Sequence, residues 1–186
     1  MELFENHDLS FLNNIGVCDV KVAFKDCKDI LVNQDSREWN DTLWDDGDLI
    51  NGNKLRTYRT FVSELSTSNY VVMNILLYKK VFSMLRCGSL PLEIEKGRHR
   101  PQPKPLNERK CKMCCADTVE DQFHFIMNCN LYEDQRQALF QHCLESKNDF
   151  NGMSEYDKFI HIMQTGNCKI IDIVFKMYMR RALFVA

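Results

Sequence analysis

Residues 111–129 read CKMCCADTVEDQFHFIMNC, and the spacing of cysteine and histidine in this stretch decides which kind of fold the chain has. Two cysteines separated by two residues are followed, after nine more residues, by a histidine and, after another four, by a cysteine: Cys111, Cys114, His124 and Cys129. Zinc prefers four tetrahedral thiolate or imidazole ligands, and a two-residue gap lets a tight turn aim two sulfur atoms at one point. The stretch therefore predicts one structural Zn²⁺ held by a Cys3His set, with no ligand position left open for catalysis.

Other cysteines and one histidine offer alternative ligands. Cys115 competes with Cys114, because it gives a gap of three residues instead of two. His142 and Cys143 follow on the next predicted helix, where a solvated histidine and a small core cysteine are the alternative interpretation. The remaining cysteines occupy apolar helical positions or helix ends and are predicted to be buried thiols: Cys18, Cys27, Cys87 and Cys168.

Apolar side chains in most of the chain recur at intervals of three and four residues, which predicts a mainly α-helical protein. We expect helices over about 17–44, 55–65, 72–85, 131–145, 154–163 and 168–184. A shorter helix carries His124 next to the apolar Phe123. Ser154 followed by Asp157 predicts an N-cap, and Gly88 predicts a left-handed helix end.

Two segments interrupt this helical pattern. Apolar and other residues alternate over 90–95, which predicts a short extended piece. Prolines at alternate positions over 100–105 predict an extended connector, because proline has no N–H and fixes φ. The predicted division is 1–50 as an acidic N-terminal helical lobe, 51–95 as a helical pair with the extended piece, 96–110 as a basic proline-rich connector, 111–132 as the zinc-binding element and 133–186 as the C-terminal helices.

The net charge of −2 indicates no partner by itself, but basic residues are concentrated before and within the zinc-binding stretch. The predicted nucleic-acid contacts are Arg98, His99, Arg100, Lys104, Arg109, Lys110 and Lys112. An arginine side chain can donate two hydrogen bonds to one phosphate, and aromatic rings can stack on bases, so this segment predicts contact with RNA or DNA. The alternative is a solvated connector whose cations balance the negative zinc cluster and nearby glutamates.

Several short motifs also occur in a set order: KLRTYRTF at 54–61, LRCG at 85–88, LEIEKGR at 92–98, RKCKMC at 109–114, VEDQFHF at 119–125 and CNLY at 129–132. Together they resemble the C-terminal zinc-binding region that follows the reverse transcriptase of animal non-LTR retrotransposons, over about residues 54–132. The resemblance implies zinc on the four ligands named above and a role in gripping the element's RNA or its target DNA. His99 and Gln122 depart from the pattern, since an aromatic and a third acidic residue are usual there. No polymerase precedes the region.

Patterns typical of enzymes are missing. The pair Asp45-Asp46 lies in an acidic, turn-rich stretch and not on a hairpin between apolar strands, where a polymerase holds two metal ions. The chain has no Pro-Asp pair, no Gly-rich phosphate loop and no Gly-x-Ser-x-Gly elbow. We therefore expect a non-catalytic zinc-binding module that contacts nucleic acid. The alternative is a structural or protein-interaction module, with a purely structural zinc and a protein partner.

The sequence also allows an expectation about the compartment of the protein, from its N-terminus and its apolar segments. The first ten residues carry acidic side chains and no basic-then-apolar signal layout. No stretch approaches the roughly 18 apolar residues that a membrane span requires. We expect a cytoplasmic or nuclear protein that is neither secreted nor bound to a membrane, so its nine cysteines are expected as thiols or metal ligands. The sequence leaves the oligomeric state open.

Overall fold

The computed structural model describes residues 20–46, 53–64, 68–72 and 75–185. Two compact units divide between Asp45 and Asp46, whereas the sequence predicts a boundary between residues 50 and 51. The first unit contributes one helix, α2 (Val20–Trp44). This confirms the predicted first helix, apart from residues 17–19, which lie outside the described residues. Most of the acidic, turn-rich stretch that follows, at 47–52, also lies outside the described residues.

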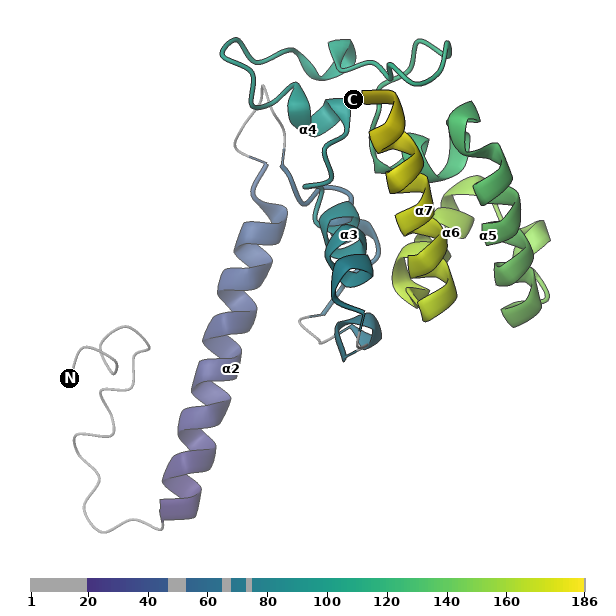
Figure 1. Ribbon diagram of the computed structural model, residues 1–186. Coiled ribbons are helices and arrows are strands. Elements are labelled where there is room, and N and C mark those ends of the chain that lie inside the picture. The colour runs from purple at the N-terminus through teal and green to yellow at the C-terminus, as the bar shows by residue number, and fades with distance from the viewer. Residues whose placement is uncertain (1–19, 47–52, 65–67, 73–74, 186) are drawn as a thin grey trace. The chain divides into compact units, whose positions relative to one another are not determined.

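The second unit is mostly helical, and Figure 1 shows its helices in chain order. The α-helices are α3 (Leu76–Arg86), α4 (Glu93–Lys96), α5 (Glu133–Ser146), α6 (Glu155–Thr165) and α7 (Cys168–Val185). Shorter helical turns are η2 (Tyr58–Thr60), η3 (Asn69–Val72), η4 (Leu106–Glu108), η5 (His124–Asn128), η6 (Asn130–Tyr132) and η7 (Phe150–Gly152). In the part of the chain that the structure describes there is no strand, and no helix is long and apolar enough to cross a membrane.

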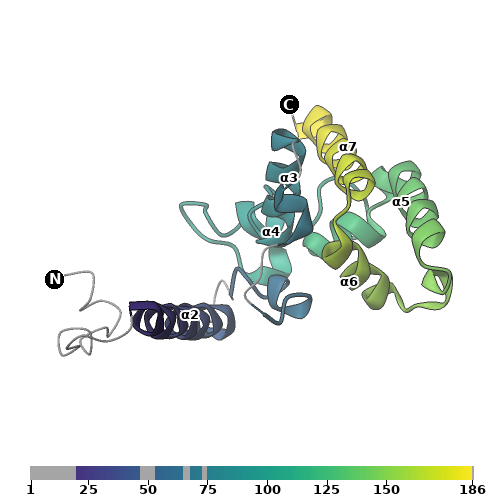
Figure 2. The same ribbon diagram turned by 90° about the horizontal axis from the view of Figure 1, so that it is seen from below.

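Helix α7 forms the centre of the second unit, because it packs against both α3 and α5 (Figure 2). Its apolar face supplies Val174 and Met177, which are fully buried. Phe82 of α3 and Leu139 of α5 are buried as completely. Since burial of one such side chain contributes about 1.5–3 kcal/mol, the predicted apolar pattern of these helices accounts for their packing.

Local signals fix several helix ends as predicted. The Ser154 hydroxyl accepts a hydrogen bond of 3.1 Å from the Asp157 N–H, which caps α6 at its N-terminus. Gly88 follows α3 with a φ of 69°, which confirms the predicted left-handed conformation. A Cβ at this glycine would lie 2.5 Å from the Lys54 carbonyl oxygen, so no larger residue fits without a shift.

The predicted helix over 55–65 is wrong in its described part, where only the short turn η2 forms. Contacts with distant residues hold this segment in another conformation. The Thr57 hydroxyl donates a 3.0 Å hydrogen bond to the side chain of Gln122. The Arg86 guanidinium lies 5.8 Å and 5.0 Å from the ring centres of Tyr58 and Phe61. These tertiary interactions outweigh the local helical pattern.

The predicted extended piece over 90–95 is also wrong, because α4 begins at Glu93. The Glu93 N–H donates a 2.7 Å hydrogen bond to the Glu120 carboxylate, which satisfies one free donor at the start of the helix. Leu92 and Ile94 are buried, but so are Glu93 and Glu95, so the alternation of apolar and polar residues does not mark a buried and an exposed face. Residues 101–105 form neither helix nor strand, and the extended course of this connector stays a prediction.

Candidate metal centre

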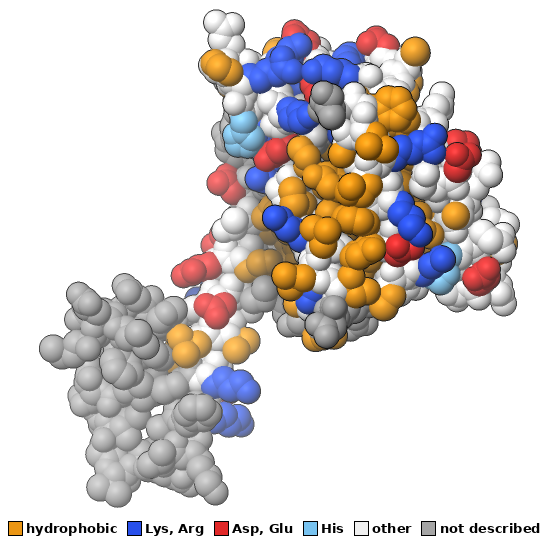
Figure 3. Space-filling view, viewed as in Figure 1, with side chains coloured by type: hydrophobic (Ala, Val, Ile, Leu, Met, Phe, Trp, Pro, Cys, Tyr) orange, Lys and Arg blue, Asp and Glu red, His pale blue; other side chains and the backbone are white. Residues whose placement is uncertain are grey.

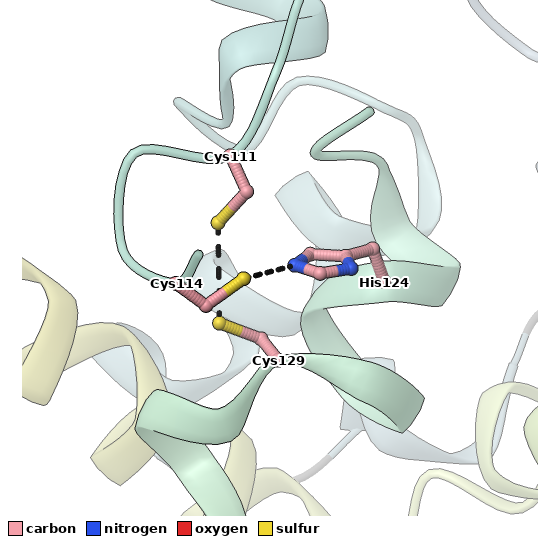
Figure 4. A group of neighbouring side chains, drawn as sticks. All are labelled: Cys111, Cys114, His124 and Cys129. Carbon is pink, nitrogen blue, oxygen red and sulfur yellow. Dashed lines mark hydrogen bonds between the residues drawn. The ribbon is translucent and has the colours of Figure 1, made fainter. Parts of the chain in front are cut away.

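The structure brings the four predicted zinc ligands together in one group (Figure 4). Their sulfur and nitrogen atoms all lie within 4.8 Å of one another. The Sγ atoms of Cys111 and Cys129 are 3.9 Å apart, and Sγ of Cys114 lies 3.4 Å from Nε2 of His124. Tetrahedral zinc with ordinary bond lengths would separate two sulfurs by about 3.8 Å and a sulfur from a nitrogen by about 3.5 Å. The geometry therefore fits a metal ion bound by three sulfurs and one nitrogen.

A short loop presents the first two sulfur atoms. The loop closes where Lys110 and Val119 form an antiparallel bridge. The Cys111 N–H donates to the Thr118 carbonyl across the base of the loop at 2.9 Å. Within the loop, the Met113 N–H donates a 3.3 Å hydrogen bond to Sγ of Cys111. The two-residue gap thus aims the sulfurs inward and supplies the first of them with an amide donor.

A short helical segment presents the other two ligands, as the sequence predicts for His124. Its end is widened into a π-turn, because the Cys129 N–H donates to the His124 carbonyl at 2.9 Å. The Asp121 carboxylate accepts the His124 N–H at 2.8 Å and fixes the start of the turn. Oγ1 of Thr118 lies 3.0 Å from Nδ1 of His124, which leaves Nε2 to face Cys114. The sequence indicated the helix but not its π-turn.

The sulfur atoms of Cys111 and Cys129 are hydrogen-bonded to each other in the absence of a metal ion. This hydrogen bond raises the pKa of Cys111 to about 12 and lowers the pKa of Cys129. Binding of a divalent cation would release the thiol protons, because cysteines bind metal as thiolates.

A buried ion pair ties the centre to α7. Arg181 makes two hydrogen bonds to the Glu120 carboxylate, one of them at 2.9 Å, and both side chains are buried. The same carboxylate lies 3.7 Å from Sγ of Cys111. Burial raises the pKa of Glu120, while the Arg181 charge opposes this effect. Sequence reasoning missed the pair, because the two residues lie 61 positions apart in the chain.

The rival ligands lie elsewhere. Cys115 is exposed and does not belong to the group, so Cys114 is the ligand that the geometry favours. His142 lies 3.2 Å from the side-chain oxygen of Asn167. Cys143 is fully buried within α5, and this burial raises its pKa to about 11. Neither residue is part of the centre.

The prediction that the remaining cysteines are buried thiols is only partly met. Cys168 is exposed at the start of α7, so the prediction is wrong for this residue. Cys168 and Lys169 are both exposed, and the buried side of α7 begins at Ile170. Cys87 is half-buried. Cys18 and the side chain of Cys27 lie outside what the structure describes.

Arg109, one of the predicted nucleic-acid contacts, lies inside the fold and holds two segments of the chain together. Its side chain is buried, with 1% of the residue exposed. The guanidinium donates to the backbone carbonyls of Lys104 and Ile94, at 2.9 Å each. Arg109 therefore fastens the connector to α4, and we leave it out of any surface that a phosphate could reach.

Four of the other predicted basic residues lie beside the glutamates of α4. Glu93 forms ion pairs with Arg100 at 3.4 Å and Lys112 at 3.1 Å. Glu95 pairs with both Arg98 at 3.4 Å and His99 at 3.1 Å, as well as with Lys54 at 2.9 Å. Lys110 pairs with Asp117 at 3.4 Å. Burial disfavours the charge on Glu95, but hydrogen bonds from Lys54 and His99 outweigh it and lower its pKa.

These pairs agree with the alternative interpretation in one respect, because nearby glutamates do offset part of the basic charge. The cations still reach the surface. Lys112 keeps 58% of its side chain exposed, and Lys and Arg side chains gather along one edge of the molecule (Figure 3). This edge therefore remains a candidate surface for an anionic partner.

Comparison with known protein families, with curated proteins and with solved structures finds no match. The resemblance to retrotransposon regions therefore stays a prediction.

Proposed function

We propose that this chain is a non-catalytic module organised by one structural zinc ion on Cys111, Cys114, His124 and Cys129. The convergence of these four ligand atoms within 4.8 Å carries the proposal. Three thiolates and an imidazole suit zinc and do not suit magnesium or calcium, which prefer oxygen ligands. Four protein ligands leave no site for a reacting water, so the ion has a structural role.

The zinc would fasten a poorly packed loop to the helical unit. Residues 112–118 are exposed or half-buried and bring little apolar surface to the core. Cys129, in contrast, is fully buried directly before η6 and α5. The Arg136 guanidinium donates to its carbonyl at 3.1 Å and 3.2 Å. A zinc ion shared by Cys129 and the loop thus connects the loop to a rigid part of α5.

Adjacent cysteines provide a matched test of this proposal. We would purify the wild type, Cys114→Ser and Cys115→Ser, measure zinc per chain, and record thermal unfolding with and without a chelator. The wild type and Cys115→Ser should each hold one zinc and lose stability on chelation. Cys114→Ser should hold much less zinc, because it lacks one ligand. Equal zinc content in both variants, or no zinc in the wild type, would refute the assignment.

Nucleic-acid contact along the basic edge is a second candidate function, favoured by the exposed cations of that edge. The residues offered are Arg98, His99, Arg100, Lys104, Lys110 and Lys112. The affinity for single-stranded RNA or DNA should fall as salt rises, because bound phosphates release counterions. Neutralising Arg100 and Lys112 should flatten this slope, whereas neutralising Lys169, an exposed residue at the start of α7, should not.

A lack of salt-dependent binding would leave the other candidate, a structural or protein-interaction module with the same zinc. Apolar side chains exposed on α3 and α7 favour that candidate: Leu76, Leu77, Met179, Leu183 and Phe184. The likeness to retroelements is kept as a hypothesis, because it rests on the short motifs alone.

A further inference from the structure

A hollow of about 440 Å³ lies where four segments of the chain meet. These segments are α4, the connector, the end of α7 and the loop at 111–118 that presents Cys111 and Cys114, called the metal loop below. The lining residues are Glu93, Lys96, Arg100, Lys112, Met113 and Phe184. The size falls within the range of small-molecule sites in proteins.

One buried carboxylate organises the cations of this hollow. The Glu93 side chain is only 6% exposed, and it pairs with both Arg100 and Lys112. Its backbone N–H is fixed by the Glu120 carboxylate, so its position is set from within the fold. Three cations against one carboxylate give the lining residues a net positive charge, with Lys96 as the third cation. The zinc cluster next to Lys112 would carry one negative charge and offset part of it.

The donors of these cations remain available to a ligand. Arg100 keeps 39% and Lys112 keeps 58% of its side chain exposed. A guanidinium has five N–H donors and an ammonium has three, so one ion pair uses only part of each group. An arginine guanidinium can donate hydrogen bonds to two oxygens of one phosphate at once.

The lining also contains two apolar side chains, Phe184 and Met113. Phe184 is 64% exposed, although a large aromatic side chain is normally covered. Met113 is half-buried. An exposed ring and a polarisable thioether offer a surface on which a flat ring can stack.

We propose that this hollow binds a phosphate monoester attached to a planar ring, either a free mononucleotide or the phosphorylated end of a nucleic-acid strand. A monoester carries close to two negative charges at neutral pH, so the net positive charge of the lining residues attracts it. Arg100, Lys96 and Lys112 hold the phosphate, and Phe184 with Met113 covers the ring. The site combines charge with apolar side chains, as small-ligand sites commonly do.

The proposal rests on the proposed zinc site, because Lys112 and Met113 are the two residues between Cys111 and Cys114. When zinc fixes these cysteines, it also fixes the position of that side of the hollow. Ligand binding and zinc binding are therefore coupled, and each should tighten the other.

The test uses the full zinc-loaded chain and isothermal titration with a nucleoside 5′-monophosphate, the matching nucleoside and inorganic phosphate. The monophosphate should bind at least about tenfold more tightly than either part alone, since each part makes only some of the contacts. Arg100→Gln and Lys112→Gln should each weaken monophosphate binding by about tenfold, because each removes charge-assisted hydrogen bonds. Lys169→Gln is the matched control and should bind as the wild type does.

Phe184→Ala should weaken binding of the monophosphate and leave binding of inorganic phosphate unchanged, which separates the ring contact from the phosphate contact. A 5′-phosphorylated oligonucleotide that binds more tightly than its 5′-hydroxyl counterpart identifies the strand end as a source. A free mononucleotide that outcompetes both identifies the small molecule. Equal binding of the two oligonucleotides, with no binding of the mononucleotide, would overturn the assignment to a monoester.

Measuring the zinc content of the chain shows whether a negative result concerns the phosphate site or the zinc centre. A chain that holds one zinc but binds no monophosphate would overturn the phosphate site and leave the metal centre intact. Zinc-free protein that binds the monophosphate as tightly as the zinc-loaded chain would overturn the coupling between the two sites. A chain that never holds zinc would refute the proposed function itself.

Discussion

The metal loop and the helices α5–α7 use different sources of stability. In the helices, side chains such as Leu139, Phe159 and Val174 are fully buried, so stability is spread over many small contacts. In the loop, residues 112–118 are exposed or half-buried, so under the proposed function the order of this segment would depend on a few ligand atoms. A region with a packed core tolerates the loss of one contact, whereas a region held by one ion does not.

Removal of the metal should have the largest effect and should act on the loop before the helices. Structural zinc contributes roughly 10–16 kcal/mol in zinc-finger peptides, far more than any single side chain. After chelation, hydrogen exchange should speed up at the amides of Cys111, Met113 and Cys129. Amides in the middle of α7 should keep most of their protection. Equal loss of protection in both regions would contradict the difference between them.

The buried ion pair between the two regions should give the next largest effect. Arg181→Met leaves the Glu120 carboxylate buried without its partner, which should cost roughly 3–5 kcal/mol in the free energy of unfolding. Arg180→Met is the control, because its 3.2 Å pair with Asp134 lies at the surface and should contribute at most about 1 kcal/mol. Urea unfolding of the zinc-loaded variants measures both values. Similar costs for the two arginines would show that the buried pair has no special role.

A change inside the helices should lower stability without affecting the metal. Gly166 ends α6 with a φ of 44°, and a Cβ there would lie 2.7 Å from the Phe82 ring. Gly166→Ala should therefore cost about 1–3 kcal/mol, whereas Gly152→Ala, where a Cβ meets nothing within 4 Å, should cost little. Zinc content should be unchanged in both. Loss of zinc from Gly166→Ala would show that the two regions are not independent.

The N-cap of α6 should give the smallest effect. Ser154→Ala removes the acceptor for the Asp157 N–H and should cost about 1 kcal/mol. Thermal unfolding of the zinc-loaded protein detects a change of this size, and zinc content should again be unchanged. A variant as stable as the wild type would mean that water replaces the cap at no cost.

Features that depend on neighbouring residues could be predicted from the sequence. The spacing of Cys111, Cys114, His124 and Cys129 identified the group that the structure brings together. The Ser154 cap and the regular apolar spacing identified α6 and α7. Each of these signals lies within a few turns of chain, so periodicity and spacing are sufficient.

Features that depend on distant contacts could not be predicted. The segment around Tyr58 has a helical pattern, but its conformation follows from Arg86 and Gln122, which come from other parts of the chain. Arg109 lies inside the fold, whereas nothing in the sequence separates it from the neighbouring surface cations. The pair of Arg181 with Glu120 joins residues separated by 61 positions, and no local pattern indicates such a partner.

X-ray absorption at the zinc edge of the purified chain tests the metal centre itself. We expect one zinc ion per chain with three sulfur neighbours at about 2.3 Å and one nitrogen neighbour at about 2.0–2.1 Å. Cys115→Ser should give the same spectrum, and Cys114→Ser should lose a sulfur neighbour or the ion itself. A zinc ion with oxygen ligands, with fewer than three sulfurs, or absent from the wild-type protein would show that these four residues do not form a zinc centre.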